Sequence, residues 1–583
     1  MISLQSSDLK IILTSIEFQA VDTILAETLE SEFGETNSWI HLAGAMVSML
    51  VRQGHAYLDL ASPEHYLRLS NALPLAWPSS DEWKQFLANS NCCTSNSEYL
   101  PLVLEQGNRL YLQRYFDHEE SVAKSISALT AKTLATETSS AFSEDAPKDL
   151  HPKQIEAIEG ALKNRFFVLT GGPGTGKTTT VLHYLVAQLL QTPNPNLVRI
   201  AIAAPTGKAA ARLSESILSS IHKLDLPKNI QETILEIPCQ TIHRLLGTRS
   251  GLNSFRHSKQ NPLAFDILII DEASMIDLPL MRRLLDALSP DTNLLLLGDQ
   301  HQLNSVSVGS VFKDLLDASQ LPSSPLANSI CQLTKTYRFD ESSGIFHLCN
   351  TIRSGKTNTF LETINNNPYH DLTIHLSDES DSHFISLVNS GFDHWKHICK
   401  SDSLETALSR LTDKITLLPL RRGRQGTEDL NQSIKRKILD GGGASESDEL
   451  FHGLPIIVLE NNYDSELYNG DLGLIWEIDG KLKACFSNTD GVDIRQFPIS
   501  SLPRHEAAFA LSIHKSQGSE FSHVSIFLSE RHEAHLSKEL IYTAFSRARD
   551  TLEIRGDKLA LIKGLSTQVK RATGLNDKLG NPN

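Results

Sequence analysis

The sequence predicts an α/β protein built around two parallel sheets, and three observations support this fold class. From residue 151 onward, short apolar runs alternate with segments of helical character, as in parallel sheets covered by helices. A glycine-rich loop follows the first of these runs, and a second set of runs lies toward the carboxyl end. At 583 residues the chain is too long for one core, so we expect several domains.

The composition excludes some classes of protein. Apolar residues make up 40% and charged residues 21% of the chain, which is ordinary for a folded soluble protein. No membrane-spanning stretch or secretory signal is visible, so we expect a cytoplasmic protein. The net charge of −15 argues against a protein that wraps duplex DNA electrostatically. The seven cysteines show no zinc or iron–sulfur spacing.

The amino-terminal part carries no recognisable chemistry. Residues 1–115 are predicted to form a mostly helical domain, with an apolar helix near residues 39–46. Residues 116–147 are expected to be a linker, because the stretch 136–147 is rich in Ser, Thr and Ala.

Residues 148–345 are predicted to form the first parallel-sheet domain. Its strands are expected at residues 166–169, 198–204, 267–270 and 294–297, and each is followed by a motif. Active-site loops of parallel sheets lie at the carboxyl ends of the strands, so the four motif loops should converge.

The second parallel-sheet domain is predicted in two parts, residues 346–440 and 505–583. Strands near residues 415–418 and 524–528 support it. The intervening residues 441–504 alternate short strand patterns with Gly, Asn and Asp turns, which favours an inserted small β-barrel, SH3-like in size.

The glycine-rich loop has the pattern GxxxxGK[ST], which predicts a nucleotide-phosphate site. Glycines let backbone N–H groups close around phosphate oxygens, and the helix that follows points its positive end at them. We expect Lys177 to reach the β- and γ-phosphates of ATP and Thr178 to bind Mg2+. The residues predicted to bind ATP here are Gly171, Gly172, Pro173, Gly174, Thr175, Gly176, Lys177, Thr178 and Thr179.

Three polar residues follow later strands. Asp271 could hold Mg2+ at a strand tip, and Glu272 could polarise the attacking water. Gln300, after the run at 294–297, could touch the γ-phosphate without adding charge. Each pattern alone more often means a solvated turn, but downstream of a phosphate loop we assign all three to catalysis.

Two arginines could supply a positive charge from the far side of the nucleotide. Arg338 lies in the segment TYRF and Arg547 in the segment YTAFSRAR. Such arginine fingers stabilise the charge on the transferred phosphoryl group and raise the rate by about 10³–10⁵. An arginine on a helix is otherwise usually a surface ion-pair partner.

The order of the motifs resembles that of superfamily 1 helicases. The series is Gln154, GGPGTGKT, APTGKAAAR (204–212), TIHRLLG (241–247), DEASMID, GDQHQL, TYRF, ALSIHKSQGSEF (510–521) and YTAFSRAR. The resemblance implies two RecA-like domains and adds Gln154 to the nucleotide-binding residues. TIHRLLG, SIHKSQGSEF and ENNYDSELYNGDLG (460–473) are most similar to the RecD branch, which implies a 5′→3′ motor.

The amino-terminal segments 54–60 and 109–115 are similar to those of the RecD (alpha) subunits of exodeoxyribonuclease V. This resemblance implies a docking domain and a heterotrimer with RecB- and RecC-type subunits. The complex would act in double-strand-break repair and recombination, with the nuclease chemistry in a partner subunit.

The resemblance also implies contacts to single-stranded or tailed duplex DNA. The residues concerned are Thr206, Lys208, Thr241, His243 and Arg244 in the first domain, and His514, Lys515, Ser516 and Gln517 in the second. Most are short donors, which suit phosphates better than base stacking.

Two alternatives stay open. The chain could be a stand-alone RecD-like helicase, or a DNA-binding scaffold that uses ATP as a switch. The complete set of catalytic side chains argues against the scaffold, and no paired carboxylates beyond those assigned to ATP support a nuclease.

Overall fold

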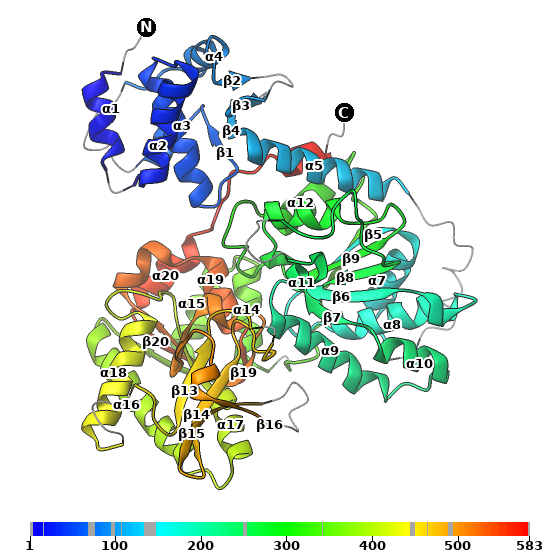
Figure 1. Cartoon of the computed structure of the whole chain (residues 1–583). Helices are drawn as coiled ribbons and strands as arrows, with labels where there is room; N and C mark the ends of the chain where they lie inside the picture. Colours follow the sequence, from blue (N-terminus) through cyan, green and yellow to red (C-terminus); the bar gives the residue numbers. More distant parts are fainter. Residues whose placement is uncertain are drawn as a thin grey trace.

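A computed structural model describes residues 4–15, 17–67, 76–94, 99–105, 108–132, 147, 149–248, 254–340, 342–443, 449–462, 464–487 and 494–580. The chain forms an amino-terminal domain, two parallel-sheet domains and an antiparallel sheet (Figure 1). Within these ranges, no helix is both long and apolar enough to cross a membrane.

The amino-terminal domain contains strands as well as the expected helices. Its helices are α1 (Ser6–Leu13), α2 (Ala20–Phe33), α3 (Ser38–Arg52) and α4 (Ser80–Ala88). Its strands are β1 (Tyr57–Asp59), β2 (Cys93–Thr94), β3 (Leu102–Glu105) and β4 (Arg109–Leu112), in the order β1-β4-β3-β2. The prediction of a mostly helical domain was therefore incomplete, because strands of two to four residues are too short to show an alternating pattern.

The expected linker is largely a helix. Helix α5 (Gln113–Thr130) crosses the predicted boundary at residue 116, and its apolar side chains Val122, Ile126 and Leu129 are buried in the core of the first parallel-sheet domain. The linker prediction was wrong for residues 116–130, since this face is amphipathic and finds a partner. Residues 133–146 lie outside the described residues.

The first parallel-sheet domain has six strands in the order β10-β5-β9-β8-β6-β7, all parallel. The strands are β5 (Phe166–Gly171), β6 (Ile200–Ala204), β7 (Cys239–Thr241), β8 (Ile267–Ile270), β9 (Asn293–Gly298) and β10 (Ile330–Leu333). The helices are α7 (Pro152–Lys163), α8 (Lys177–Leu190), α9 (Gly207–Ile221), α10 (Lys228–Leu235), α11 (Ile242–Leu246), α12 (Leu278–Asp286) and α13 (Val311–Ser319). All four predicted strands are confirmed.

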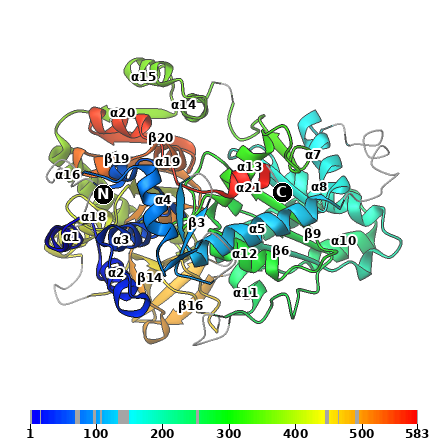
Figure 2. The same cartoon turned by 90° about the horizontal axis from the view of Figure 1, so that it is seen from above.

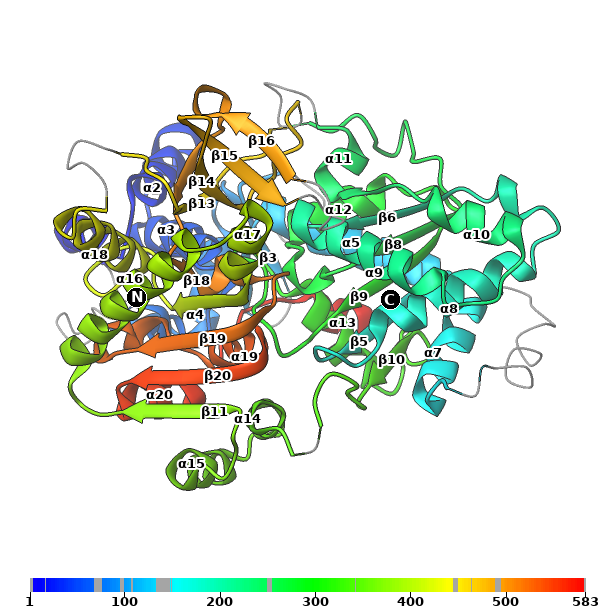
Figure 3. The same ribbon diagram turned by 90° about the horizontal axis from the view of Figure 1, so that it is seen from below.

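The second parallel-sheet domain has five parallel strands in the order β11-β20-β19-β12-β18, beside the first domain (Figure 3). The strands are β11 (Leu372–Leu376), β12 (Lys414–Leu418), β18 (Ala510–Ser512), β19 (Phe521–Leu528) and β20 (Ala548–Gly556). The helices are α14 (Gly344–Arg353), α15 (Thr357–Asn366), α16 (Ser380–Cys399), α17 (Leu404–Asp413), α18 (Thr427–Asp440), α19 (Lys538–Phe545) and α20 (Lys558–Ser566).

The insertion is an antiparallel sheet in the order β16-β15-β14-β13-β17. Its strands are β13 (Leu454–Val458), β14 (Leu472–Ile478), β15 (Lys481–Ser487), β16 (Ile494–Pro498) and β17 (His505–Ala507). The insertion therefore extends past the predicted end at residue 504. The pairing among the described residues joins the strands in an open order, so closure into a barrel stays a prediction.

The chain end does not stay with the second domain. Residues 567–580, here called the C-terminal strap, run back to the first domain and end in α21 (Leu575–Gly580) beside α5 and α13 (Figures 1 and 2). The Arg571 guanidinium donates to the carbonyl oxygens of Ser305, Ser307 and Gly309 at 2.6–2.7 Å. The domain predicted for residues 505–583 thus ends earlier, because the strap completes the first domain's core with two leucines of α21.

Candidate nucleotide site and strand path

The phosphate loop lies between β5 and α8, as its sequence predicts. Gly174 and Gly176 have φ angles of 70° and 82°, a backbone region that favours glycine. A Cβ atom at Gly174 would lie 2.3 Å from the Cβ atom of Arg338. The loop therefore needs glycine at this position both for its backbone angle and for the approach of the TYRF segment.

The charged groups of the first domain gather at the loop. Lys177 Nζ donates to the carbonyl oxygens of Gly171 at 2.6 Å and Gly172 at 3.2 Å. Asp271 directly follows β8; burial and the adjacent charge of Glu272 raise its pKa, while Lys177 pulls it down. The structure thus brings Lys177 and the acidic pair close enough for their charges to interact. Thr178 lies in the first turn of α8, and Thr179 beside it is exposed.

Gln154 is buried at 3% exposure and lies against the phosphate loop. Its Nε2 donates to the Gly176 carbonyl at 3.4 Å, and its Oε1 accepts from the Tyr337 hydroxyl at 3.0 Å. The Tyr337 backbone N–H donates to the Gly174 carbonyl at 2.7 Å, while its side chain is 50% exposed. Sequence reasoning missed this ring, which offers a stacking surface for a base beside the loop; its signal was the aromatic residue directly before Arg338.

The two glutamines of the GDQHQL segment differ in burial and in hydrogen-bond partners. The amide nitrogen of Gln300 lies 3.2 Å from His301 Nε2, and the structure gives it no bond to the phosphate loop. Gln302 is 5% exposed; its Nε2 donates to Asp299 at 3.3 Å, and its buried Oε1 has no partner. The role assigned to Gln300 stays a prediction, and Gln302 is a second candidate that sequence reasoning passed over.

The two predicted fingers meet near Glu520. Arg338 pairs with the Glu520 carboxylate through Nη2, and its buried Nη1 has no partner. Arg547 is 3% exposed and donates to the carbonyl oxygens of Thr543 at 3.0 Å and Ser519 at 3.1 Å. Its charge also lowers the pKa of Glu520. Arg338 therefore reaches toward the interface, whereas Arg547 is held inside the second domain.

A small cleft joins the phosphate loop to the second domain. Its walls are Gly172, Pro173, Thr175, Thr336, Phe339, Phe346, Cys349, Asn350, Arg353, Tyr542 and Ser546. Ser546, next to Arg547 in the chain, is therefore at the same cleft as the loop. A Cβ atom at Gly172 would lie 3.3 Å from Arg353 Nη1, so Arg353 is a further cation that sequence reasoning missed.

A cavity of about 630 Å³ lies where both domains and the insertion meet, and it is lined by Lys208, Thr241 and Arg244. From the insertion come Tyr468 and Asp471, among others. Burial lowers the pKa of Lys208 to about 8, while the charge of Asp471 acts in the opposite direction. Three of the five first-domain residues predicted to contact the DNA thus line one cavity.

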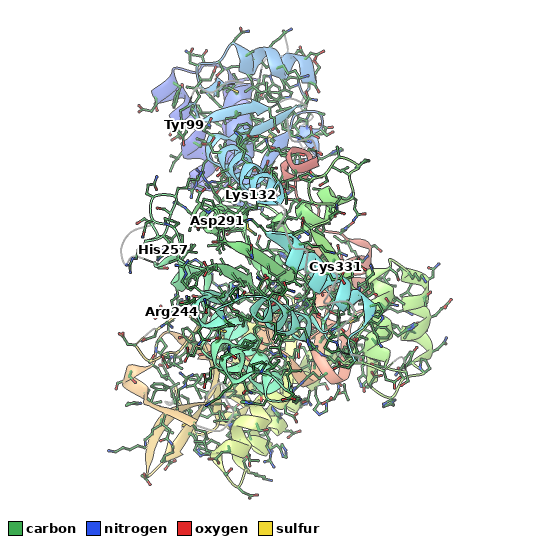
Figure 4. The ribbon with its side chains drawn as sticks, turned by 90° about the vertical axis from the view of Figure 1, so that its right-hand side faces the viewer. Tyr99, Lys132, Arg244, His257, Asp291 and Cys331 are labelled. Atoms are coloured by element: carbon green, nitrogen blue, oxygen red, sulfur yellow. The ribbon has the colours of Figure 1, made fainter. Side chains whose placement is uncertain are left out.

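The neighbouring polar residues of the first domain differ in exposure. Thr206 and Thr241 cap the amino ends of α9 and α11, and each accepts a bond from a backbone N–H of its helix at 3.2 Å. Thr241 is only 4% exposed. His243 and Arg244 are exposed, and Figure 4 marks Arg244 at the edge of the domain. The two exposed side chains are the better placed for phosphate contacts.

Most of the second-domain residues predicted to contact the DNA strand are bonded to other parts of the protein. His514 is exposed, and Lys515 pairs with Glu506 of β17. Ser516 is fully buried and donates to the Ile513 carbonyl, and Gln517 donates to the Leu303 carbonyl at 3.2 Å. Both side chains are bonded inside the protein in this structure, and their contact with the DNA strand stays a prediction.

Two parallel-sheet domains, a phosphate loop on the first and an arginine-bearing second domain define a P-loop motor ATPase of the superfamily 1 helicase class. Residues 154–308 match the AAA domain, residues 507–554 the UvrD-like helicase C-terminal domain, and residues 16–111 the RecBCD enzyme subunit RecD N-terminal domain.

Two relatives match this chain over almost its whole length. The chain is 33% identical to the RecBCD enzyme subunit RecD of Mycolicibacterium smegmatis, over 96% of this chain and 97% of that one. It is 31% identical to the Haemophilus influenzae RecBCD enzyme subunit RecD, over 93% and 92% of the two chains. Among solved structures, Bacteroides Pif1 bound to ssDNA aligns with a TM-score of 0.39 and 18% identity, covering 71% and 94% of the two chains.

The chain belongs to the RecD family of RecBCD enzyme subunits. It is an ATP-dependent DNA helicase of that family, and the resemblance found in its motifs is confirmed.

Proposed function

We propose that the chain is the 5′→3′ motor subunit of a RecBCD-type helicase–nuclease complex in double-strand-break repair and recombination, driven by Mg2+-dependent ATP hydrolysis. One observation carries the ATP-driven part of this proposal, and the RecD-type motifs support the polarity. The phosphate loop, the pair Asp271–Glu272 and the finger Arg338 meet at the interface between the two parallel-sheet domains, where Arg338 also pairs with Glu520 of the second domain.

The residues at the loop fit a magnesium–ATP complex. Hydroxyl and carboxylate oxygens are the ligands Mg2+ prefers, and the Thr178 hydroxyl and the Asp271 carboxylate supply them from α8 and the end of β8. The raised pKa of Asp271 marks a buried carboxylate that gains from a nearby cation. Mg2+ held there would neutralise charge on the β- and γ-phosphates.

The remaining residues act on the nucleotide itself. Lys177 exchanges its two loop carbonyls for phosphate oxygens, and Glu272 orients and polarises the attacking water. Arg338 and Arg547 stabilise the charge that develops on the γ-phosphoryl group. Tyr337 supports the base beside Gln154. Closure of the interface brings Arg547 into play, since Ser546 already lines the cleft.

The DNA strand passes over the cavity that holds Lys208, Thr241 and Arg244. The exposed His243 and Arg244 offer phosphate contacts. Each closure and opening of the ATP interface shifts the two domains along the strand. Separating one base-pair step costs about 1.4 kcal/mol on average, a modest load for such a cycle.

The RecB- and RecC-type partners follow from the relatives, whose printed names are RecBCD subunits. The match over residues 16–111 favours a subunit over a stand-alone helicase. The chain is 27% identical to the ATP-dependent RecD2 DNA helicase of Deinococcus radiodurans, but spans only 69% of it.

The test is strand displacement on 5′-tailed and 3′-tailed duplexes, with and without RecB- and RecC-type subunits. We expect ATP-dependent unwinding of the 5′-tailed substrate and stable assembly with both subunits. Unwinding from the 3′ tail would refute the polarity, and an active chain that binds neither subunit would favour a stand-alone helicase. An ATPase that ignores single strands would favour the ATP-switched scaffold.

A further inference from the structure

Glu520 links the two parallel-sheet domains by charge. It lies directly before β19 of the second domain, and its side chain is 13% exposed. One carboxylate oxygen pairs with Arg338 and the other with Arg212, both from the first domain. Among the residues that the structure describes, no other ion pair joins these two domains. The carboxylate is therefore shared between two arginines that come from different motifs.

The charges around this carboxylate are unbalanced. Burial would raise the pKa of Glu520, but Arg212, Arg338 and Arg547 together hold the pKa below its ordinary value. One carboxylate thus faces three guanidinium groups. Arg338 Nη1 is buried and has no partner, so this arginine can still accept an anion. Its Cβ atom packs on Gly174 of the phosphate loop, where a γ-phosphate is the expected anion.

The other partner of Glu520, Arg212, lies on the side of the cavity where the DNA strand is proposed to pass. Arg212 lies on α9, one turn after Lys208, and also donates to the Gly518 carbonyl at 3.3 Å. Arg212, Lys208 and Glu520 all line the cavity of about 630 Å³. Glu520 consequently touches the nucleotide side through one oxygen and the strand side through the other.

We propose that Glu520 is a positioning residue that couples the nucleotide to the DNA strand by sharing its carboxylate between Arg338 and Arg212. An incoming γ-phosphate draws Arg338 from the carboxylate, because two anions then compete for one guanidinium. Arg212 is left as the partner of Glu520 and draws α9, with Lys208, toward segment 518–520. This inference rests on the proposed role of Arg338 as a finger.

The diagnostic variant is Glu520→Gln, which keeps the shape and removes the charge. Arg338 no longer leaves an ion pair to reach ATP, so KM for ATP should fall about fivefold, as expected for one partly buried pair. The stimulation of ATPase by single-stranded DNA should fall about tenfold, because the link to Arg212 is lost. Glu520→Asp, which keeps the charge, should retain at least half of the stimulation.

The variant Arg212→Gln tests the two ion pairs of Glu520 separately, because it removes only the pair with Arg212. It should lower the stimulation by DNA as Glu520→Gln does, but raise KM for ATP rather than lower it, because Glu520 is then left to Arg338 alone. The matched control is Asp266→Asn, which removes the exposed pair with Arg199 at 2.8 Å on the same domain and should change neither quantity. Thermal unfolding of each full-length variant, with binding of a fluorescent ATP analogue, identifies any loss that comes from misfolding.

The outcomes distinguish this inference from the proposed function. A Glu520→Gln chain with wild-type KM and wild-type stimulation by DNA overturns the coupling role alone. An Arg338→Ala chain with wild-type turnover overturns the finger and the coupling with it. If Glu520→Gln unfolds, the test is made on Arg212→Gln, and an unchanged stimulation by DNA in that variant overturns the proposal.

Discussion

The two parallel-sheet domains present their site residues in opposite ways. In the first domain, His243 and Arg244 are exposed and Lys177 lies over the phosphate loop. In the second domain, Arg547 and Ser516 are buried and bonded to backbone carbonyls. The first domain thus presents a largely preformed surface, in which Lys177 has loop carbonyls to exchange. Arg547 and Ser516 of the second domain must release their backbone bonds before they can touch a ligand. We therefore expect the second domain to be the side that rearranges when ATP binds.

The largest expected effect concerns Arg547, the buried arginine of the second domain. Arg547→Ala should bind ATP nearly normally but lose about 10³ or more in kcat, because the charge is needed only in the transition state. Turnover and nucleotide binding measured side by side give the result. Arg547→Lys serves as a control for packing. A loss confined to ATP affinity would contradict the finger role.

The preformed side is tested at Lys177. Lys177→Gln should fold and bind DNA, yet lose about 10²–10³ in ATP turnover, as for other groups that stabilise charge in a transition state. Single-turnover hydrolysis with saturating DNA is the measurement. DNA-stimulated ATPase at the wild-type rate would remove the phosphate site from this loop.

Lys208 gives the strand path a pH dependence. Its pKa is lowered to about 8 by burial, so the ammonium is charged below this pH and neutral above it. Affinity for single-stranded DNA should therefore fall as pH rises through 8, by up to about tenfold at pH 9. Lys208→Arg should abolish this fall, since arginine stays charged. A fall of equal size in Lys208→Arg would place the titrating group elsewhere.

The smallest effect sharpens the comparison within the second domain. Ser516→Ala should change affinity for single-stranded DNA by less than about twofold, because the hydroxyl is fully buried and donates to Ile513. The exposed His514 is its matched partner, and His514→Ala should weaken binding more. Fluorescence anisotropy with a labelled oligonucleotide compares the two variants. A larger loss of affinity in Ser516→Ala than in His514→Ala would show that the segment reorients when DNA binds.

Much of the site could be predicted from sequence because its motifs directly follow apolar strands. The spacing from β5 to Lys177 and from β8 to Asp271 is local, so pattern and position agree. The orientation of Ser516 could not be predicted, since it depends on the turn that starts at Ile513. The same holds for Gln302, which is buried while its neighbour Gln300 is not.

The errors in the fold have a common physical origin in distant contacts. Helix α5 was expected as linker because composition near residue 140 suggested one, but its apolar stripe is satisfied by the first domain. The strap could not be predicted, since the bonds of Arg571 to Ser305 and Gly309 join residues more than 260 positions apart. Local patterns carry no information about such partners.

The C-terminal strap limits how the motor can move. The second domain is attached to the first by the connection after β10 and again by the strap, which Arg571 fastens to three carbonyl groups. A body held at two separate points can turn freely only about the line that joins them. Opening and closing should therefore follow a single axis. Cutting the chain between residues 567 and 570 would allow rotations about other axes, which yield no step along the DNA strand.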